Sequence, residues 1–487
     1  MSTKRYELYK VSGVEWLGNV PSHWRVDRLK ASIHTCRNGI WGEEALGDEN
    51  DIPCVRVADF DRRRLRVELS EPTIRNVTEK ERIGRVLRQG DLLLEKSGGG
   101  ENQPVGCVVL YDDARPAVCS NFVARMVSAT GQDSSYWRYV HAAAYAIRLT
   151  VGSINQTSGI QNLDQARYFN EYAVFPPQPE QAAIAAFLDR ETGKIDALVE
   201  EQRCLIELLK EKRKAVISRA VTKGLNPNAP MKDSAVEWLG TVPAHWSVTK
   251  LKHLVIESVA GPYGASLTKD MYTASGYRVY GQQQVIPDDF EVGDYFISEE
   301  KFEEMRRYSV FEGDVLVSVM GTIGKVAVVP GDAQPGIINP RLVRYRCSDR
   351  IRARFLQRVL LSQKHQDHLL FEAKGTTMDG LNMSTLGNVP VLVPPIAEQA
   401  SILESLADAI REIDELVAAA DHAADLLRER RAALISAAVT GKIDVRDSTD
   451  LLTAWAETKA DIAAGRFVSE SAKAHVARDR AMAKRDD

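Results

Sequence analysis

The eleven residues VEWLGNVPSHW at positions 14–24 recur, almost unchanged, as VEWLGTVPAHW at positions 236–246. Nine of the eleven positions are identical, and the two copies lie 222 residues apart. Repetition at a fixed distance is the signature of an internal duplication, and a duplication dictates the architecture of a chain. The 487 residues therefore divide into two halves of one design.

A second set of repeats closes each half. FPPQPEQ at 175–181 matches VPPIAEQ at 393–399, and AVISRAVT at 215–222 matches ALISAAVT at 433–440. These copies lie 218 residues apart, so the two halves differ in length by four residues before this point. Each half reads as a globular region followed by a helical one.

The helical regions follow the two Pro-Pro pairs and run for about 44 residues each, from Glu180 to about Lys223 and from Glu398 to about Gly441. At 1.5 Å per residue each helix would be roughly 65 Å long. One seven-residue series is apolar at nine of ten positions, as the a positions of a coiled coil require. Its members are Leu188, Ile195, Gln202, Leu209, Val216, Leu406, Ile413, Ala420, Leu427 and Leu434.

The companion series, three residues further along each helix, is patchier. It contains Glu191, Lys212 and Arg430 beside apolar residues, which argues against a long parallel zipper. Since the two halves are equivalent and covalently joined, we expect the helices to pack antiparallel as an intramolecular coiled coil. The alternative is that each helix packs on its own domain. Gly193 has Arg411 as its counterpart, so we expect the first helix to be continuous.

The globular regions 1–174 and 230–392 carry short apolar runs separated by Gly and Pro turns. A shared skeleton is visible: GDLLL at 90–94 parallels GDVLV at 313–317, and Asn121 is set against Asn339. The loop contents differ, so we expect two binding modules that read different targets. The predicted fold class is α+β, with two mixed α/β domains, two long antiparallel helices and a pseudo-twofold repeat. Predicted strands are 52–57, 91–94, 105–110, 122–127, 315–319, 325–329 and 341–345.

Composition is that of an ordinary globular protein, with 44% hydrophobic and 27% charged residues and a net charge of −4. The six cysteines form no CxxC pair, so they predict neither a zinc site nor a disulfide framework. The sequence contains no apolar stretch typical of a signal peptide or a membrane span. We therefore expect a cytoplasmic location with no membrane partner.

The sequence lacks the catalytic motifs of several enzyme classes. GTIGK at 321–325 has the wrong spacing for a nucleotide-binding loop, and Val326 stands where a hydroxyl is needed. The sequence has no GxSxG elbow and no Asn-Pro-Pro-aromatic run of an amino-methyltransferase. His365 and His368 lie on a predicted helix without the spacing of a zinc protease, so we expect them to face solvent.

With these motifs in place, the chain resembles a type I restriction-modification specificity (S) subunit, over about residues 1–447. The residues that carry the resemblance are the box at 14–24 and 236–246, Pro-Pro-x-x-Glu-Gln at 176–181 and 394–399, and Ile-Ser-x-Ala-Val-Thr at 217–222 and 435–440.

The resemblance implies two target-recognition domains, 1–175 and 225–392, each reading one half of a bipartite, gapped sequence in double-stranded DNA. The helices 176–224 and 393–441 would be the spacer between them, followed by a tail at 442–487 with a possible short helix. It also implies two adenine-specific methyltransferase subunits that carry S-adenosylmethionine, and motor-nuclease subunits that use ATP and Mg²⁺. This chain itself would hold no cofactor, metal or catalytic residue.

Base contacts are expected from polar and basic loop residues, because Asn and Gln pair with adenine and Arg pairs with guanine. The candidates are Arg62, Arg63, Arg64, Ser97, Asn102, Gln103, Thr157, Gln161 and Asn162 in the first half, and Tyr263, Gln282, Gln283, Gln284, Thr376, Thr377 and Asn382 in the second. As no region carries a bulk positive charge, we expect weak DNA binding by the isolated chain and tight binding by the assembly. The alternatives are a modification-only complex without a motor subunit, a coiled-coil scaffold without DNA function, and a stand-alone nuclease or methyltransferase.

Overall fold

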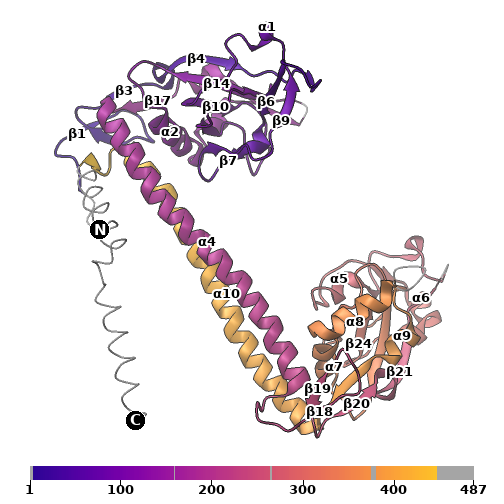
Figure 1. Ribbon diagram of the computed structural model, residues 1–487. Helices are drawn as coiled ribbons and strands as arrows, with labels where there is room; N and C mark the ends of the chain where they lie inside the picture. Colours follow the sequence, from indigo (N-terminus) through magenta and orange to yellow (C-terminus); the bar gives the residue numbers. More distant parts are fainter. Residues whose placement is uncertain (1–3, 158, 264–265, 375–379, 447–487) are drawn as a thin grey trace, which may run out of the picture. The chain divides into compact units, whose positions relative to one another are not determined.

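The computed structural model describes residues 4–157, 159–263, 266–374 and 380–446 (Figure 1). The chain separates into two compact units, Met1–Gln202 with Ala423–Asp487, and Arg203–His422. Each unit holds one globular domain and one half of each long helix, so the unit boundaries fall inside the helices. The predicted tail beyond residue 446 lies outside the described residues.

The long helices are α4 (Gln178–Lys223) and α10 (Ile396–Val439). Gly193 does not interrupt α4, as expected. Each helix is followed by a glycine in the left-handed region, Gly224 and Gly441, both with φ of 73°, a conformation that ends helices and favours glycine. In the first unit Asp196 of α4 pairs with Arg431 of α10, and in the second unit Arg213 pairs with Asp414. A residue further along α4 thus pairs with a residue closer to the start of α10, so the two helices run antiparallel.

The seam between α4 and α10 contains the predicted seven-residue series. Leu188, Ile195, Leu209, Leu406, Ile413 and Ala420 are buried, whereas Gln202, Val216, Leu427 and Leu434 are half-buried. The predicted companion series is wrong along the middle of the helices, where Leu198 is 43% and Leu416 is 46% exposed, although its first members, Ile184 and Ile402, are buried. The side chains that face the partner lie four residues further along instead, as Val199, Ile206, Ala424 and Ala438 do.

The first unit is built on a six-stranded sheet of order β4-β14-β10-β12-β8-β7. Helix α2 covers one face and joins the largest core of this unit, together with the start of α4 and the end of α10. The unit also contains a four-stranded sheet, β13-β6-β9-β5, a three-stranded sheet, β11-β16-β15, and the two-stranded sheets β1-β2 and β17-β3.

The elements of the first unit are β1 Tyr9–Val11, β2 Asn19–Pro21, β3 Arg25–Arg28, β4 Ile33–Asn38, β5 Glu43–Glu44, β6 Asp51–Val55, β7 Phe60–Asp61, β8 Arg66–Val67, β9 Thr73–Asn76, α1 Glu79–Arg82, β10 Asp91–Glu95, β11 Ser97–Gly98, β12 Val108–Tyr111, β13 Val118–Cys119, β14 Val123–Ser128, α2 Ser134–Ala146, β15 Ile154–Thr157, β16 Ile160–Leu163, α3 Gln165–Tyr168 and β17 Tyr172–Phe175.

The second unit repeats this plan with a four-stranded sheet of order β21-β27-β24-β25 and a three-stranded sheet of order β23-β22-β26. Its elements are β18 Met231–Asp233, β19 Thr241–Pro243, β20 Ser247–Lys250, β21 Val255–Ala260, β22 Tyr277–Tyr280, α5 Gln282–Val285, β23 Phe296–Ile297, α6 Glu299–Glu304, β24 Val315–Ser318, β25 Val326–Val328, β26 Gly336–Ile338, β27 Leu342–Cys347, α7 Ala353–Leu360, α8 Gln363–Lys374, α9 Met383–Asn388 and β28 Pro390–Val393.

A buried ion pair occupies the same place in both main sheets. Arg125 on β14 binds Asp91 on β10 at 2.6 Å, and Arg344 on β27 binds Asp314 on β24 at 3.1 Å. In each unit the arginine and the aspartate lie on neighbouring strands at the centre of the sheet. The shared pair shows that the two domains have one internal design, as the sequence skeleton predicts.

The expectation that His365 and His368 face solvent is wrong. His365 is fully buried, with its Nε2 3.0 Å from the Pro390 carbonyl oxygen, and His368 stacks on Trp238 at 4.4 Å between ring centroids. Neither faces solvent freely, because α8 packs against the second copy of the duplicated box. In the first unit His141 is buried with its Nδ1 2.7 Å from the Tyr168 hydroxyl.

Acid should weaken both units through these histidines. Burial lowers the pKa of His141 and of His365 to about 4, from 6.5. Below pH 6.5 the unfolded chain therefore binds more protons, and stability falls as the pH falls towards 4. Each histidine should cost roughly 1.4 kcal/mol per pH unit in this window. Urea unfolding at pH 7.5 and 5.0 measures the loss, and the double variant His141→Gln, His365→Gln should lose less than the parent chain. Equal losses in both proteins would contradict this account.

Candidate nucleic-acid interface

The duplicated sequence box is a clamp on the first turn of each long helix. In the first unit the Glu180 carboxylate lies 2.7 Å from His23 Nε2 and accepts a hydrogen bond from Trp24 Nε1 at 2.9 Å. In the second unit Glu398 does the same with His245 Nε2 at 2.8 Å and Trp246 Nε1 at 3.1 Å. The box and the glutamate of the Pro-Pro-x-x-Glu-Gln repeat therefore recur together, because the same contact joins them in both units.

The glutamine that follows each glutamate fixes the helix to the domain. Gln181 is buried and its Oε1 accepts from the backbone N–H of Asp133, the residue that caps α2. Gln399 is also buried and accepts from the backbone N–H of Arg352, which precedes α7. Each also donates to the carbonyl of the first proline of its Pro-Pro pair. The Glu-Gln pair therefore locks the helix start to both the box and the domain helix.

The same box receives the end of the other long helix. A Cβ on Gly441 would lie 2.3 Å from Pro21 and 3.0 Å from the Trp24 ring, so only glycine fits there. Gly224 lies against Trp246 in the equivalent way. Each unit therefore anchors both helices at one box, and the duplicated motifs have a structural role.

The candidate recognition surface lies where β4 and β21 end. Gly39 follows β4 and donates its N–H to the Val123 carbonyl, and Gly261 follows β21 and donates to the Leu342 carbonyl, both at 2.9 Å. A Cβ on Gly39 would lie 2.1 Å from the Cys119 oxygen, and one on Gly261 would lie 1.9 Å from the Asn339 oxygen. The chain must therefore pass directly over the loop before β14 or β27, and the residues two positions after the glycines, Trp41 and Tyr263, are exposed.

This register corrects the sequence alignment by one residue. Val123 donates to the Ser120 carbonyl and Leu342 to the Asn339 carbonyl, so Ser120 is the counterpart of Asn339. Phe122 is consequently the counterpart of Arg341, and Trp41 is the counterpart of Tyr263. Sequence reasoning did not select Trp41 or Phe122 as candidates, and it did not recognise that Arg341 is the counterpart of Phe122. A large aromatic residue two positions after a strand-ending glycine in both halves is the signal that could have found them.

The arginine triplet predicted for base contact faces the protein. Arg62 binds the buried Glu95 at 2.8 Å, and Arg63 binds Glu200 of α4 at 3.2 Å. The Arg63 carbonyl also accepts from Arg431 of α10. Arg64 is exposed and lies 3.8 Å from Asp61. Arg62 therefore joins the turn between β7 and β8 to β10, Arg63 joins it to the long helices, and Arg64 alone of the three is exposed.

The other candidates of the first half gather around one loop, at residues 97–105. Ser97 is buried and donates to Asn162 Oδ1 at 2.7 Å, whereas Gln161 is buried and accepts from the Val105 N–H at 3.3 Å. The Gln103 amide, with its oxygen towards Arg62, accepts from Arg62 Nε at 2.6 Å. Asn102 is exposed on this loop, and the backbone of Thr157 ends β15. Ser97 and Gln161 thus hold the loop in place.

The candidates of the second half divide in the same way. Gln284 is buried and caps α5 by accepting from the Gly281 N–H at 2.8 Å, so it is a structural residue. Asn382 caps α9 by accepting from the Thr385 N–H. Gln283 and Tyr263 are exposed, and Gln282 is half-buried. The predicted Thr376 and Thr377 lie outside the described residues.

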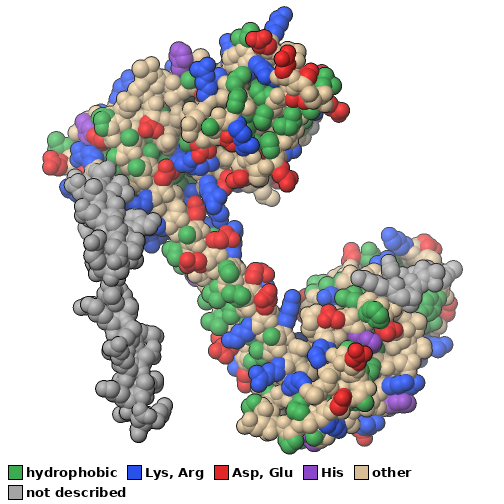
Figure 2. Space-filling model, viewed as in Figure 1, with side chains coloured by type: hydrophobic (Ala, Val, Ile, Leu, Met, Phe, Trp, Pro, Cys, Tyr) green, Lys and Arg blue, Asp and Glu red, His purple; other side chains and the backbone are tan. Residues whose placement is uncertain are grey.

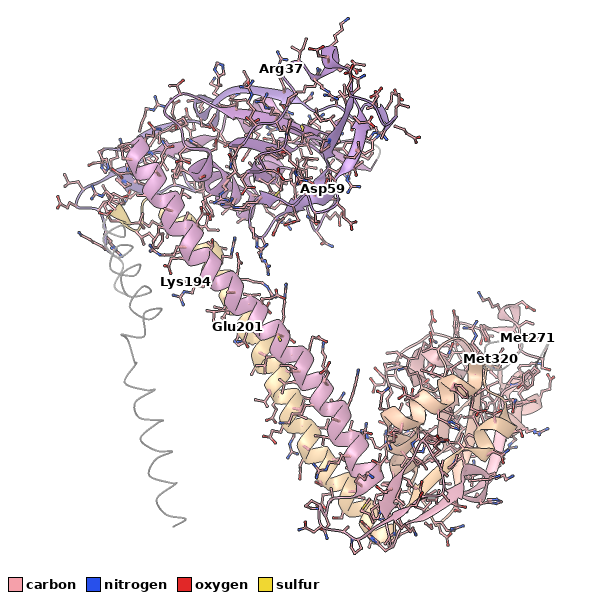
Figure 3. The ribbon with its side chains drawn as sticks, in the orientation of Figure 1. Arg37, Asp59, Lys194, Glu201, Met271 and Met320 are labelled. Atoms are coloured by element: carbon pink, nitrogen blue, oxygen red, sulfur yellow. The ribbon has the colours of Figure 1, made fainter. Side chains whose placement is uncertain are left out.

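Charge is interspersed over each unit, as Figure 2 shows for the visible face. Several arginines of the stretch 341–354 are paired internally: Arg344 and Arg346 both bind Asp314, and Arg354 binds Asp288. Figure 3 draws the side chains as sticks, with Arg37 labelled in the first unit and Met320 in the second. Over the described ranges, no group of His, Cys, Asp and Glu is arranged to hold a metal ion, and no helix is long and apolar enough to cross a membrane.

The comparisons with known proteins show which family the chain is similar to. Residues 264–419 match the family model of the type I restriction modification DNA specificity domain. The chain is 23% identical over 301 residues to the type I restriction enzyme MjaVIII specificity subunit of Methanocaldococcus jannaschii, covering 60% of this chain and 66% of that protein. It is 24% identical to the EcoBI specificity subunit of Escherichia coli, covering 63% and 64%. The chain is thus similar to type I restriction-modification specificity subunits.

Solved structures share the fold of this chain. One, from a study of the assembly and conformational transition of a type I R-M system, superposes with a TM-score of 0.65 at 16% identity, covering 86% of this chain and 98% of that one. The HsdS subunit from Thermoanaerobacter tengcongensis superposes with a TM-score of 0.52 at 15% identity, covering 87% and 98%. The matches in sequence span about two thirds of the length of the curated relatives named above.

Proposed function

We propose that this chain is the non-catalytic subunit that reads a bipartite, gapped DNA target for a type I restriction-modification complex. The observation that carries the proposal is one loop frame that occurs in both domains with different side chains. Trp41 and Phe122 in the first unit stand where Tyr263 and Arg341 stand in the second. Two readers of one design with different contents fit a target of two different half-sites.

The long helices serve as the spacer in this proposal. Their antiparallel seam and their anchoring at the boxes give each reader a rigid base. Each half engages one adenine methyltransferase subunit that carries S-adenosylmethionine, and motor-nuclease subunits that use ATP and Mg²⁺ complete the restriction complex. The near-neutral charge, −4 overall, supports a reader that relies on its partners for much of the phosphate contact.

Shortening the spacer tests this function. Deleting one heptad from each helix, residues 203–209 and 418–424, removes segments that face one another and preserves the register on either side. The loss of seven residues shortens each helix by about 10 Å, or about three base pairs at 3.4 Å per step. We expect both methylated half-sites to stay unchanged while the gap between them shrinks by about three base pairs.

Sequencing of methylated adenines in cells that carry the complex gives the measurement. Deleting residues 203–209 alone is the control, because it leaves the helices mismatched and should abolish methylation. A chain that acts only as a scaffold would leave the gap unchanged, and that result would contradict the proposal. A modification-only complex would show the same motif without restriction of unmodified DNA.

A further inference from the structure

The pair Trp41 and Phe122 forms an exposed apolar surface on the first unit. Trp41 is 38% and Phe122 is 47% exposed, and both line a hollow of about 460 Å³ with Val57 and Ala58. Each side chain leaves much of its apolar surface in water, and a contiguous exposed apolar patch is typical of a binding site. The clustering of two large apolar side chains over one hollow separates this site from scattered surface residues.

The two aromatic residues are held in place rather than loosely exposed. The Arg75 guanidinium lies over the Trp41 ring at 4.6 Å and donates to the Trp41 carbonyl at 3.1 Å. The Phe122 carbonyl accepts from the backbone N–H groups of Lys96 and Ser97. Both loops are also tied together where Gly39 crosses Cys119. A rigid aromatic contact loses little entropy on binding, which suits a recognition site.

Basic side chains border this hollow. Arg56 lines it and pairs with Asp59 at 2.9 Å, and Arg75 stacks on Trp41. An apolar hollow with cations beside it fits the edge of a DNA groove, where phosphates flank the bases. In the major groove the apolar group that a base presents is the 5-methyl of thymine, and Phe is among the side chains that contact it.

One of the two equivalent positions of the second unit has the opposite chemistry: Arg341 stands in place of Phe122, whereas Tyr263 is an exposed aromatic residue like Trp41. Arg341 is exposed, and its Nη1 donates to Gln282 Oε1 at 3.2 Å. Gln282 is in turn fixed, because its Nε2 donates to Ser318 Oγ at 2.8 Å and to the Met320 carbonyl at 2.6 Å. The guanidinium is thus oriented by a tethered amide, and an oriented guanidinium pairs with the O6 and N7 of guanine.

We propose that these equivalent loop positions determine specificity, with Trp41 and Phe122 reading a thymine methyl group in the first half-site and Arg341 reading a guanine in the second. This inference rests on the proposed function and deepens it. It assigns residues to each half of the target, and it explains why one backbone frame serves two sequences.

Uracil scanning tests the first assignment. The full chain is assembled with its methyltransferase subunits, its methylated motif is determined, and each thymine of the motif is replaced in turn by uracil, which lacks the methyl group. One replacement in the first half-site should weaken binding of the unaltered complex by about fourfold, the effect of one buried methyl group. The Phe122→Ala complex should bind both duplexes equally.

Matched variants separate this contact from general damage. Ile83→Ala removes another exposed apolar residue of the same unit and should keep both affinity and uracil sensitivity. Arg341→Ala should lower affinity about tenfold or more and relax one G·C position in the second half-site alone.

The outcomes are distinct. If Phe122→Ala keeps the uracil sensitivity of the parent, or if both variants weaken all sequences alike, the inference fails while the proposed function stands. If no methylated motif depends on this chain at all, the proposed function itself fails.

Discussion

Replacing Asp196 with alanine is expected to lower the free energy of unfolding of the first unit by about 3–5 kcal/mol, the cost of leaving a buried charge unpaired. Asp196 lies 3.1 Å from Arg431, and their side chains are only 13% and 15% exposed. Arg431 also donates to the Arg63 carbonyl, which keeps it inside the contact between the helices and the domain. Loss of the carboxylate therefore strands a guanidinium that has little access to water.

The duplication supplies a matched control for this prediction. Asp414 is the counterpart of Asp196 and lies 3.5 Å from Arg213, but these side chains are 55% and 43% exposed. Asp414→Ala should cost under about 1 kcal/mol, because water replaces the partner of an exposed ion pair. Urea unfolding, with hydrogen exchange to assign the loss to one unit, measures both variants. Equal losses of stability in the two variants would show that burial does not decide how much an ion pair between the helices contributes.

Replacing Glu180 with alanine should destabilise the first unit by about 2–4 kcal/mol, since a buried donor left without its acceptor costs about 1–3 kcal/mol by itself. Trp24 is fully buried and donates its Nε1–H to Glu180, and His23 loses the same partner. We further expect faster hydrogen exchange in the first turns of α4, because this contact anchors the helix start to the box.

Two further variants sharpen this test. Glu201→Ala changes an exposed glutamate on the same helix and should shift stability by less than about 0.5 kcal/mol. Combining Glu180→Ala with Trp24→Phe removes donor and acceptor together, so the double variant should lose less than the sum of the single ones. Additive losses would mean that the clamp acts through packing alone.

The helices could be predicted from the sequence, but their contacting faces only in part. Leu188 and its relatives repeat every seven residues in both halves, and that repetition was enough to place one column in the seam. The second column could not be chosen, because Leu198 and Leu205 on one side look as apolar as Val199 and Ile206 on the other. The column that faces the partner helix also contains Arg213 and Arg431, and two charged residues make a seam position look exposed in the sequence.

The candidate interface was harder to predict. Polar loop residues were the natural choice, yet Ser97, Gln161 and Gln284 are buried and hold their own loops. A short polar side chain next to a strand serves a backbone N–H as readily as a base, and sequence does not show which N–H groups lack partners. Exposed aromatic residues such as Trp41 read as core residues until their burial is known.

The sequence by itself determined the duplication, the two long helices and the resemblance to the family, because each depends on residues repeated at fixed distances along the chain. Only the tertiary structure decided why the repeats exist: Glu180 and Glu398 each meet a His-Trp pair more than 150 residues away. It also decided which loop side chains face outward at the ends of β4 and β21. Both answers depend on contacts between distant segments, and such contacts are set by the packing of backbone and side chains in three dimensions rather than by local pattern.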